Sequence, residues 1–127
     1  MTDEEGIRRT LALYCQYLDA RKFPEWAGLF TEDGDWNGNV SRAAILDNIA
    51  SGALAKRPEL RRKHVCTNII MRVNGGEAQA ESDFVMYDAN GPAEPWHVAA
   101  WGRYVDTLVQ RPEGWLFATR KLINSSN

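Results

Sequence analysis

Hydrophobic side chains recur at helical spacing near the start of the chain. Thr2 and Glu5 form the S/T-x-x-E signature of a helix N-terminus. An apolar stripe then follows at intervals of three and four residues, through Ile7, Leu11, Tyr14, Cys15 and Leu18. This spacing predicts a first helix over about residues 3–20.

Two shorter helical patterns come next. Pro24 suits a first helical position, and the apolar residues after it predict a short helix that ends at a turn over residues 31–35. Ser41 is the predicted N-cap of a third helix, which fades at Ser51-Gly52. Residues 56–63 are typical of a charged loop.

From His64 onward the hydrophobic pattern changes to a period of two. It predicts strands over residues 64–73, 77–87, 96–109 and 115–123, followed by a polar tail over residues 124–127. Three helices followed by an antiparallel meander predict an α+β fold, a cone-shaped barrel in which the helices pack on one face of a curved, mainly antiparallel sheet. Pockets in such folds lie inside the cone, beside the adjoining helix.

His64 begins the first predicted strand. Because side chains alternate across a strand, His64, Cys66, Asn68 and Ile70 are expected to share one face. A titratable ring at the mouth of this partly polar face suits an acid–base site. The structural alternative is a histidine that only caps the end of a strand.

Asp19 continues the row Ile7, Leu11 and Cys15 into the last turn of the first helix. A helix C-terminus disfavours an anion, and an acid beside a buried face is costly unless it is paired. Asp19 therefore breaks two local rules, and such breaks often mark functional residues. The alternative is a carboxylate that is solvated or paired with the basic residues after it.

Composition narrows the class of protein. The chain has 127 residues, of which 44% are hydrophobic, so we expect one domain over residues 1–127. The net charge is −2 and the basic cluster Arg61-Arg62-Lys63 is short, which argues against a nucleic-acid partner. With no apolar run of membrane-spanning length, we expect a soluble, cytoplasmic protein without a membrane partner. Cys15 and Cys66 lack metal-ligand spacing, which predicts two reduced thiols and no metal site.

The order of several residues resembles that of a known family. The chain carries Tyr14-x-x-x-x-Asp19, then Trp36, His64-x-x-x-Asn68, Gly102-Arg103-Tyr104-x-Asp106 and Gly114-Trp115-x-x-x-x-Arg120. This order is similar to that of SnoaL-like proteins in the nuclear-transport-factor-2-like superfamily. The likeness covers nearly the whole chain and is closest to the scytalone dehydratase group, which includes hexachlorocyclohexane dehydrochlorinase and the bile-acid dehydratase.

The resemblance implies a usually oligomeric α+β barrel with an Asp/His pair at the floor of a deep cavity. In the lyases of this group the histidine transfers the proton and the aspartate orients it, which matches His64 and Asp19. The family tyrosine and the arginine on the final strand match Tyr14 and Arg120. Scytalone dehydratase carries a second active-site histidine on the next strand, which this chain lacks, so a generic Asp/His lyase is the better expectation.

The expected reaction begins with removal of a proton next to a carbonyl group. His64 is the expected base, and Asp19 would fix its tautomer and favour the imidazolium. Tyr14 or Arg120 would donate to the developing enolate oxygen if either points inward. An outward Arg120 is the alternative. Loss of hydroxide, water or halide then completes an elimination that needs neither a metal nor an organic cofactor.

The expected substrate is a small, cyclic and largely apolar molecule. The residues expected to line its pocket are Trp36, Asn68, Phe84, Met86 and Trp101. Trp96 and Trp101 point to opposite faces, and a hydrophobic outer face of the sheet would favour a homodimer or homotrimer. His97 is expected to be structural or to lie at an interface.

Two other functions stay open on the sequence alone. One is an enzyme of the polyketide-cyclase or ketosteroid-isomerase type, in which an inward carboxylate such as Asp83 or Asp106 is the base. The other is a non-catalytic ligand-binding or scaffold subunit, like the β subunit of aromatic-ring dioxygenases, which a cone filled by side chains would favour. The fold hosts many unrelated activities and does not choose among them.

Overall fold

The computed structural model describes residues 1–124, which form four helices and six strands. The helices are α1 (Asp3–Asp19), α2 (Phe23–Ala27), α3 (Arg42–Ala50) and α4 (Ala53–Lys56). The strands are β1 (Phe30–Trp36), β2 (Asn39–Val40), β3 (Arg61–Asn74), β4 (Glu77–Ala89), β5 (His97–Arg111) and β6 (Gly114–Asn124).

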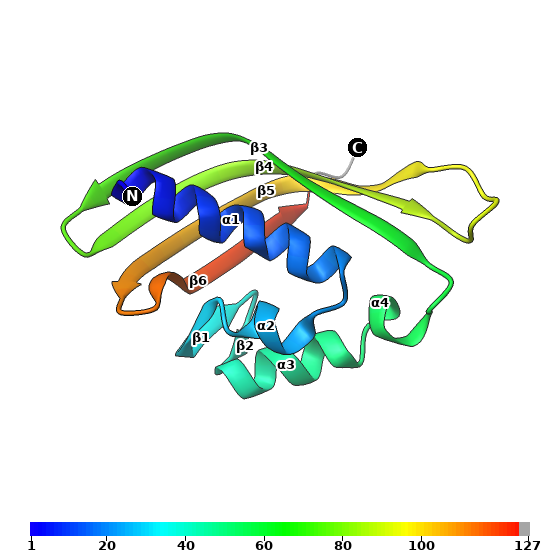
Figure 1. Ribbon diagram of the computed structural model, residues 1–127, viewed down its shortest axis with the longest axis horizontal. Helices are drawn as coiled ribbons and strands as arrows, with labels where there is room; N and C mark the ends of the chain where they lie inside the picture. The colour runs from blue at the N-terminus through cyan, green and yellow to red at the C-terminus, as the bar shows by residue number, and fades with distance from the viewer. Residues whose placement is uncertain (125–127) are drawn as a thin grey trace.

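The strands form one curved sheet in the order β2-β1-β6-β5-β4-β3. Neighbouring strands are antiparallel except for β1 and β6, which run parallel. The long strands β3 to β6 curve around α1, while α3 packs against β1 and α2 (Figure 1). The α+β cone expected from the sequence is therefore confirmed, with the helices on one face of a mainly antiparallel sheet.

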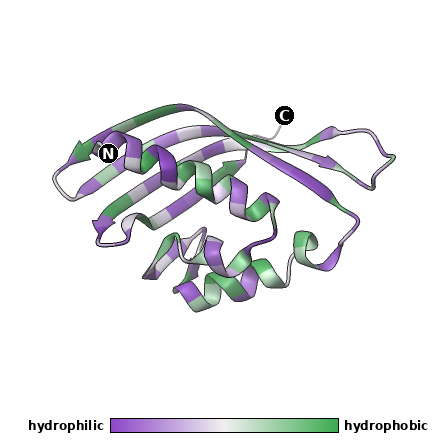
Figure 2. Cartoon of the chain, viewed as in Figure 1, coloured by the Kyte–Doolittle hydropathy of each residue, from purple (hydrophilic) through white to green (hydrophobic). Residues whose placement is uncertain are grey.

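Helix α1 forms where its sequence pattern predicts it. The Glu5 N–H donates to the Thr2 hydroxyl at 3.1 Å and the Thr2 N–H donates to the Glu5 carboxylate at 3.0 Å, which completes a capping box. The predicted apolar stripe is buried against the sheet. Figure 2 shows hydrophobic and hydrophilic residues alternating along the long strands, as a sheet with one buried face requires.

Strand β1 is an element that the sequence pattern does not predict. Residues 31–35 are mostly polar and contain a glycine, which is typical of a turn. In the structure β1 pairs with β6, and Phe30 lies opposite Phe117 while Trp36 lies opposite Arg120. Pairing with a distant strand, which local composition does not encode, overrides the turn signal. The predicted loop over residues 56–63 is also shorter, because β3 begins at Arg61.

A β-bulge in β3 changes which residues face the interior. Asn68 adopts a left-handed backbone conformation with φ of 54°, and the pairing of β3 with β4 shifts around it. Asn68 is exposed and donates to the Asp83 carboxylate at 2.9 Å. The prediction that it shares the inner face with His64 and lines the pocket is therefore wrong. Past the bulge, Ile69 and Met71 pack against the core instead.

Two further expectations concern the predicted polar tail and the absence of a membrane-spanning segment. Asn124 is the last residue of β6, and residues 125–127 of the predicted polar tail lie outside the described residues. Within residues 1–124, no helix is both long and apolar enough to cross a membrane.

Replacing Gly102 by alanine should destabilise the sheet. A Cβ at Gly102 would clash with the Ile123 carbonyl oxygen, so the β5–β6 pairing would have to distort. We expect Gly102→Ala to lower the free energy of unfolding by about 2 kcal/mol or more, measured by urea denaturation.

Gly76→Ala is the matched control, because a Cβ there meets nothing within 4 Å. It should change the free energy of unfolding by less than about 0.5 kcal/mol. Equal effects of the two substitutions would contradict the steric argument.

Candidate active site

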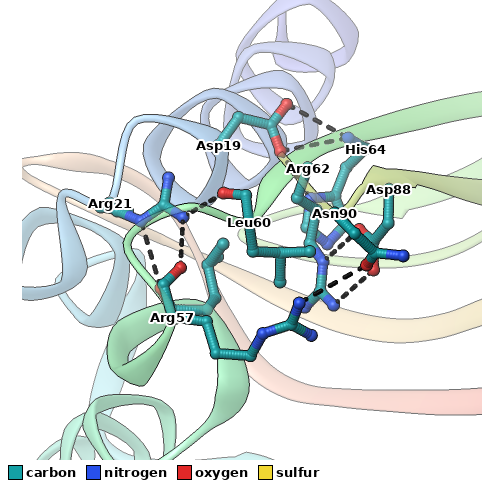
Figure 3. A network of polar contacts seen from close by, with 9 residues as sticks. Asp19, Arg21, Arg57, Leu60, Arg62, His64, Asp88 and Asn90 are labelled. Atoms are coloured by element: carbon teal, nitrogen blue, oxygen red, sulfur yellow. Dashed lines mark hydrogen bonds and ion pairs between the residues drawn. The ribbon is translucent and has the colours of Figure 1, made fainter. Parts of the chain in front are cut away.

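Asp19 and His64 meet where the end of α1 lies against the start of β3 (Figure 3). The Asp19 Oδ1 lies 2.6 Å from the His64 Nδ1, and both carboxylate oxygens accept from the His64 backbone N–H at 3.1 Å. Only 9% of the histidine side chain and 15% of the aspartate side chain are exposed. The two predicted residues therefore form a short, charge-assisted contact, which we call the dyad.

The dyad explains why an acid ends α1. The last turn of α1 carries no basic residue, so the helix itself offers Asp19 no partner. The His64 ring and backbone N–H supply the donors instead, which offsets the cost of an anion at this position. Because Nδ1 faces the carboxylate, it carries the hydrogen, and Nε2 is left as a proton acceptor. Nε2 is not among the fully buried polar atoms without a partner in residues 1–124.

Arg21 also stabilises the junction between the end of α1 and the start of β3. Its backbone is left-handed, with φ of 58°, directly after the end of α1. Its guanidinium donates to the carbonyl oxygens of Leu54 at 3.1 Å, Arg57 at 3.3 Å and Leu60. These bonds fix the chain just before β3, so they hold the strand that carries His64 (Figure 3).

An ion pair lies beside the dyad on the inner face of the sheet. Arg62, two residues before His64, donates through Nε and Nη2 to the Asp88 carboxylate at 2.8 and 2.9 Å. Hydrogen bonds from Arg62 hold the pKa of Asp88 below its ordinary value. Nearby, the Arg57 Nη2 donates to the Asn90 Oδ1 at 3.5 Å (Figure 3). The rim of the candidate site is thus built from paired charges.

Tyr14 and Trp36, two residues predicted for the site, bind each other inside the cone. The Trp36 Nε1 donates to the Tyr14 hydroxyl at 3.1 Å. Burial raises the pKa of Tyr14 to about 12, although Arg120 opposes the rise. Three aromatic rings surround Tyr14 at centroid distances of 5.5 to 5.8 Å, those of Trp26, Tyr104 and Phe117. Tyr14 therefore stays protonated within an aromatic core.

Arg120 points inward but is enclosed by the core. Its Nε and Nη2 donate to the Asp106 carboxylate at 2.8 and 3.0 Å, and both side chains are fully buried. Burial disfavours the charged guanidinium, but Asp106 outweighs this effect and keeps the pKa of Arg120 above its ordinary value. Its Cζ lies 3.6 to 4.4 Å from the ring centroids of Tyr14, Tyr104 and Phe117. Only Nη1 lacks a partner within the described residues.

An enzyme of the ketosteroid-isomerase type requires an inward carboxylate as its base. The structure has one, but it is already hydrogen-bonded to an arginine. Asp106 faces the interior, yet both of its oxygens accept hydrogen bonds from Arg120. Asp83 lies on the outer face, where it pairs with Arg103 at 3.0 Å. Both carboxylates are therefore already paired with arginine side chains.

Phe84 and Met86 face the interior, whereas Trp101 does not. Phe84 is buried and stacks on a tyrosine ring with centroids 4.5 Å apart, and Met86 lies directly opposite His64. Trp101 is 43% exposed, because alternation along β5 turns it away from the buried side of the sheet that Gly102 faces. The prediction that Trp101 lines the pocket is therefore wrong.

Aromatic side chains fill much of the cone interior. Five surface hollows of about 310 to 520 Å³ lie on the described part of the chain, and none of the five is lined by Asp19 or His64. Met86, which lies directly opposite His64, is partly buried, and its unbranched side chain is adaptable.

Three polar residues that face the interior were not predicted as site residues: Arg62 beside the dyad, and Ser82 and Tyr104 deeper in the cone. Arg62 falls in the predicted loop, because β3 begins earlier than its hydrophobic pattern does. Alternation with Phe84 could have placed Ser82 on the inner face, and Tyr104 belongs to the Gly102-to-Asp106 motif. That the buried Ser82 hydroxyl lacks a partner among the described residues is visible only in the folded protein.

The thiols and acids of residues 1–124 do not gather with histidine into a group of three that could hold a metal ion. Cys15 and Cys66 are both free. Burial raises the pKa of the Cys15 thiol to about 12, so this thiol stays protonated at neutral pH.

Comparison with known proteins identifies the family. Residues 1–121 match the SnoaL-like domain, and the chain therefore belongs to the SnoaL-like family. No protein with a curated function matches the chain significantly.

Solved structures share the fold over nearly the whole chain. Rv3472 from Mycobacterium tuberculosis, a protein of unknown function, is 27% identical with a TM-score of 0.82, over 96% of this chain and 76% of that chain. A candidate scytalone dehydratase from Novosphingobium aromaticivorans is 24% identical with a TM-score of 0.84, over 97% and 84%. The β subunit of a candidate aromatic-ring-hydroxylating dioxygenase from the same species is 17% identical with a TM-score of 0.79, over 97% and 89%. The last two show a common fold alone.

The Arg62–Asp88 pair should make stability depend on pH in acid. Because the pKa of Asp88 is lower in the folded protein than in the unfolded chain, its stabilisation is fully present above the unfolded value of about 3.9 and is lost as pH falls through the folded value. We expect Asp88→Asn to reduce the free energy of unfolding at neutral pH and to flatten its decline below pH about 4. Urea titrations at successive pH values measure both effects.

Asp47→Asn is the control for this titration, since Asp47 is exposed on α3. Its stability should follow the wild-type pH dependence. A decline in Asp88→Asn as steep as that of the wild type would contradict the assignment.

Proposed function

We propose that this protein is a cofactor-independent lyase of the dehydratase type, or an isomerase, acting on a small, cyclic, largely apolar molecule. The observation that carries the proposal is the 2.6 Å contact between the Asp19 Oδ1 and the His64 Nδ1. A carboxylate in this position orients the imidazole, fixes its tautomer and stabilises the imidazolium that forms when Nε2 takes a proton.

In the proposed reaction His64 is the base. Its Nε2 takes a proton from a carbon next to a carbonyl group, and the electron pair of the broken C–H bond forms an enolate. The enolate then expels hydroxide or halide from the neighbouring carbon, which leaves a carbon–carbon double bond. The imidazolium returns its proton to the departing hydroxide, or to solvent when halide leaves. An isomerase returns the same proton to a different carbon of the substrate.

Family membership and the lining of the site support this chemistry. The SnoaL-like fold is shared with a candidate scytalone dehydratase, and a dehydratase performs an elimination of this kind. Phe84 and Met86 present apolar surface on the inner face beside the dyad, and Trp36 lies deeper, which suits an apolar ring better than a highly charged substrate.

Removal of the imidazole should abolish turnover. Wild-type protein screened against hydroxylated and halogenated cyclic ketones and alicyclics should form an unsaturated product, which product analysis or, where conjugated, ultraviolet absorbance detects. We expect His64→Ala to lower kcat/KM by about 10² to 10⁴ and Asp19→Asn to lower it by about tenfold or more.

His97→Ala is the matched control, because His97 is the chain's other histidine and is exposed at the start of β5. It should turn over substrate at the wild-type rate. A His64→Ala protein with full activity would refute the proposed mechanism.

The filled interior favours a second candidate, a non-catalytic scaffold or ligand-binding subunit. The structural likeness to a dioxygenase β subunit fits this reading. The dyad would then serve only to link α1 with β3. In that case His64→Ala would lower stability, and the wild type would turn over none of the screened compounds.

We also infer that copies of the chain associate through the outer face of the sheet. Apolar side chains 40% to 72% exposed lie on this face, namely Val65, Ile70, Trp101 and Ile123. Asp83 and Arg103 add opposite charges to the same surface. A two-fold axis would bring each charge of one copy near its opposite in the other, so the face is complementary to itself.

Trp101→Glu should therefore weaken self-association. We expect a wild-type homodimer, with a homotrimer as the other oligomer that this surface permits, and a shift toward monomer in the variant, measured by analytical ultracentrifugation. Val40→Glu is the control, because Val40 is 58% exposed on β2, at the opposite edge of the sheet from β3. A monomeric wild type would contradict the inference.

A further inference from the structure

The chain's two cysteines lie one step along from the dyad, on the same two elements. Cys15 comes four residues before Asp19 on α1, which places it on the same side of the helix one turn earlier. Cys66 comes two residues after His64 on β3, which places it on the same inner face of the sheet, where it packs against the core. Both thiols are free in this structure. The two cysteines are therefore placed to form the next contact between helix and strand.

Helix α1 and strand β3 run in opposite directions, so the two steps away from the dyad lead the same way. The two elements lie side by side, and β3 is the strand that packs most closely on α1 (Figure 1). From Asp19 to Cys15 the helix axis advances by about 6 Å. From His64 to Cys66 the strand advances by about 6.6 to 6.8 Å. Because the two advances are nearly equal, Cys15 faces Cys66 as Asp19 faces His64.

The dyad also shows how closely the two backbones approach. Both oxygens of the short Asp19 side chain reach the His64 backbone N–H at 3.1 Å. A disulfide needs a similarly close approach, with Cα atoms about 4.4 to 6.8 Å apart. Burial is the largest cause that raises the pKa of Cys15, and Cys66 is the next, ahead of Asp19 on the same helix. This order agrees with two thiols that are near neighbours.

We propose that Cys15 and Cys66 form a modification site, at which hydrogen peroxide joins them in a reversible disulfide between α1 and β3. The Cys66 sulfur first takes an oxygen from the peroxide as the O–O bond breaks, which yields a sulfenic acid and water. The Cys15 sulfur then attacks the Cys66 sulfur and the S–O bond breaks. The leaving hydroxide takes the Cys15 proton and becomes a second water. The two sulfurs lose two electrons in all, and the peroxide gains them.

The surroundings of the two thiols assign them different roles. Cys15 is only 7% exposed and stays protonated at neutral pH, so it is poorly placed to meet the peroxide. Cys66 is partly exposed and lies on β3, the edge strand of the sheet. Because a protonated thiol attacks slowly, the Cys66 sulfenic acid should last long enough to be trapped. The disulfide would join the elements that the dyad joins, whether or not His64 is catalytic.

The test counts thiols in the reduced, folded wild type before and after treatment with hydrogen peroxide. We expect both thiols to be lost, and mass spectrometry of the digested protein should find the Cys15 peptide linked to the Cys66 peptide. The product should run as a single chain in electrophoresis, and dithiothreitol should restore both thiols. Because the crosslink constrains the unfolded chain, it should raise Tm by about 5 °C or more.

Cys15→Ala and Cys66→Ala are the matched controls. Each keeps one thiol and all of the methionines, which peroxide also oxidises. Peroxide should raise the Tm of neither variant. Dimedone, which traps sulfenic acids, should label Cys66 in the Cys15→Ala protein and leave Cys15 unlabelled in the Cys66→Ala protein.

Two results would overturn the disulfide site. One is a treated wild type that keeps both thiols or carries Cys66 as a sulfinic or sulfonic acid. The other is a crosslink that forms only between separate chains. Failure of the proposed lyase reaction is a separate result, because His64→Ala keeps both cysteines and should still form the disulfide.

Discussion

One carboxylate at the end of α1 joins the first helix to the sheet, and the geometry of the site depends on it. Asp19 accepts from the His64 ring and from the His64 backbone N–H, which is shared between both of its oxygens. Without these donors Asp19 would be an unpaired anion at a helix C-terminus. Arg21 reinforces the junction through carbonyl oxygens just before β3. The contact that positions the imidazole is therefore also one that stabilises the fold.

A second constraint acts deeper in the cone, where Arg120 and Asp106 hold β5 to β6 inside an aromatic core. Taking two charges out of water is costly, and well-packed hydrophobic residues of similar volume often stabilise a core as well or better. The pair is buried completely, yet the Arg120 Nη1 is left without a partner in the described residues. Stability alone therefore does not account for this choice of residues. Such departures from the rules of packing are expected where a protein binds or transforms a ligand.

The sequence predicts those parts of the structure that local rules govern. Helix α1 has its cap and its apolar stripe in the printed sequence, and Asp19 stands out there because it breaks two of these rules. The position of Asn68 is different, because a bulge reverses the alternation that places it beside His64. Trp101 is misplaced for another reason. Alternation shows only that Trp101 and Gly102 face opposite sides of the sheet. Which of these two sides meets the helices is decided by packing across the whole sheet. Strand β1 likewise depends on a partner strand remote in sequence.

The choice between an enzyme and a scaffold turns on what the fold needs from these residues. A link between α1 and β3 requires only the backbone N–H of residue 64, which nearly any side chain would leave in place. The imidazole adds a second bond to Asp19, and it presents a ring nitrogen that no other described residue uses. The buried Ser82 Oγ and Arg120 Nη1 likewise have no hydrogen-bond partner among the described residues. Hydrogen-bonding capacity beyond structural need therefore occurs at the dyad and again deeper in the cone, which favours a ligand-binding role over a purely structural one.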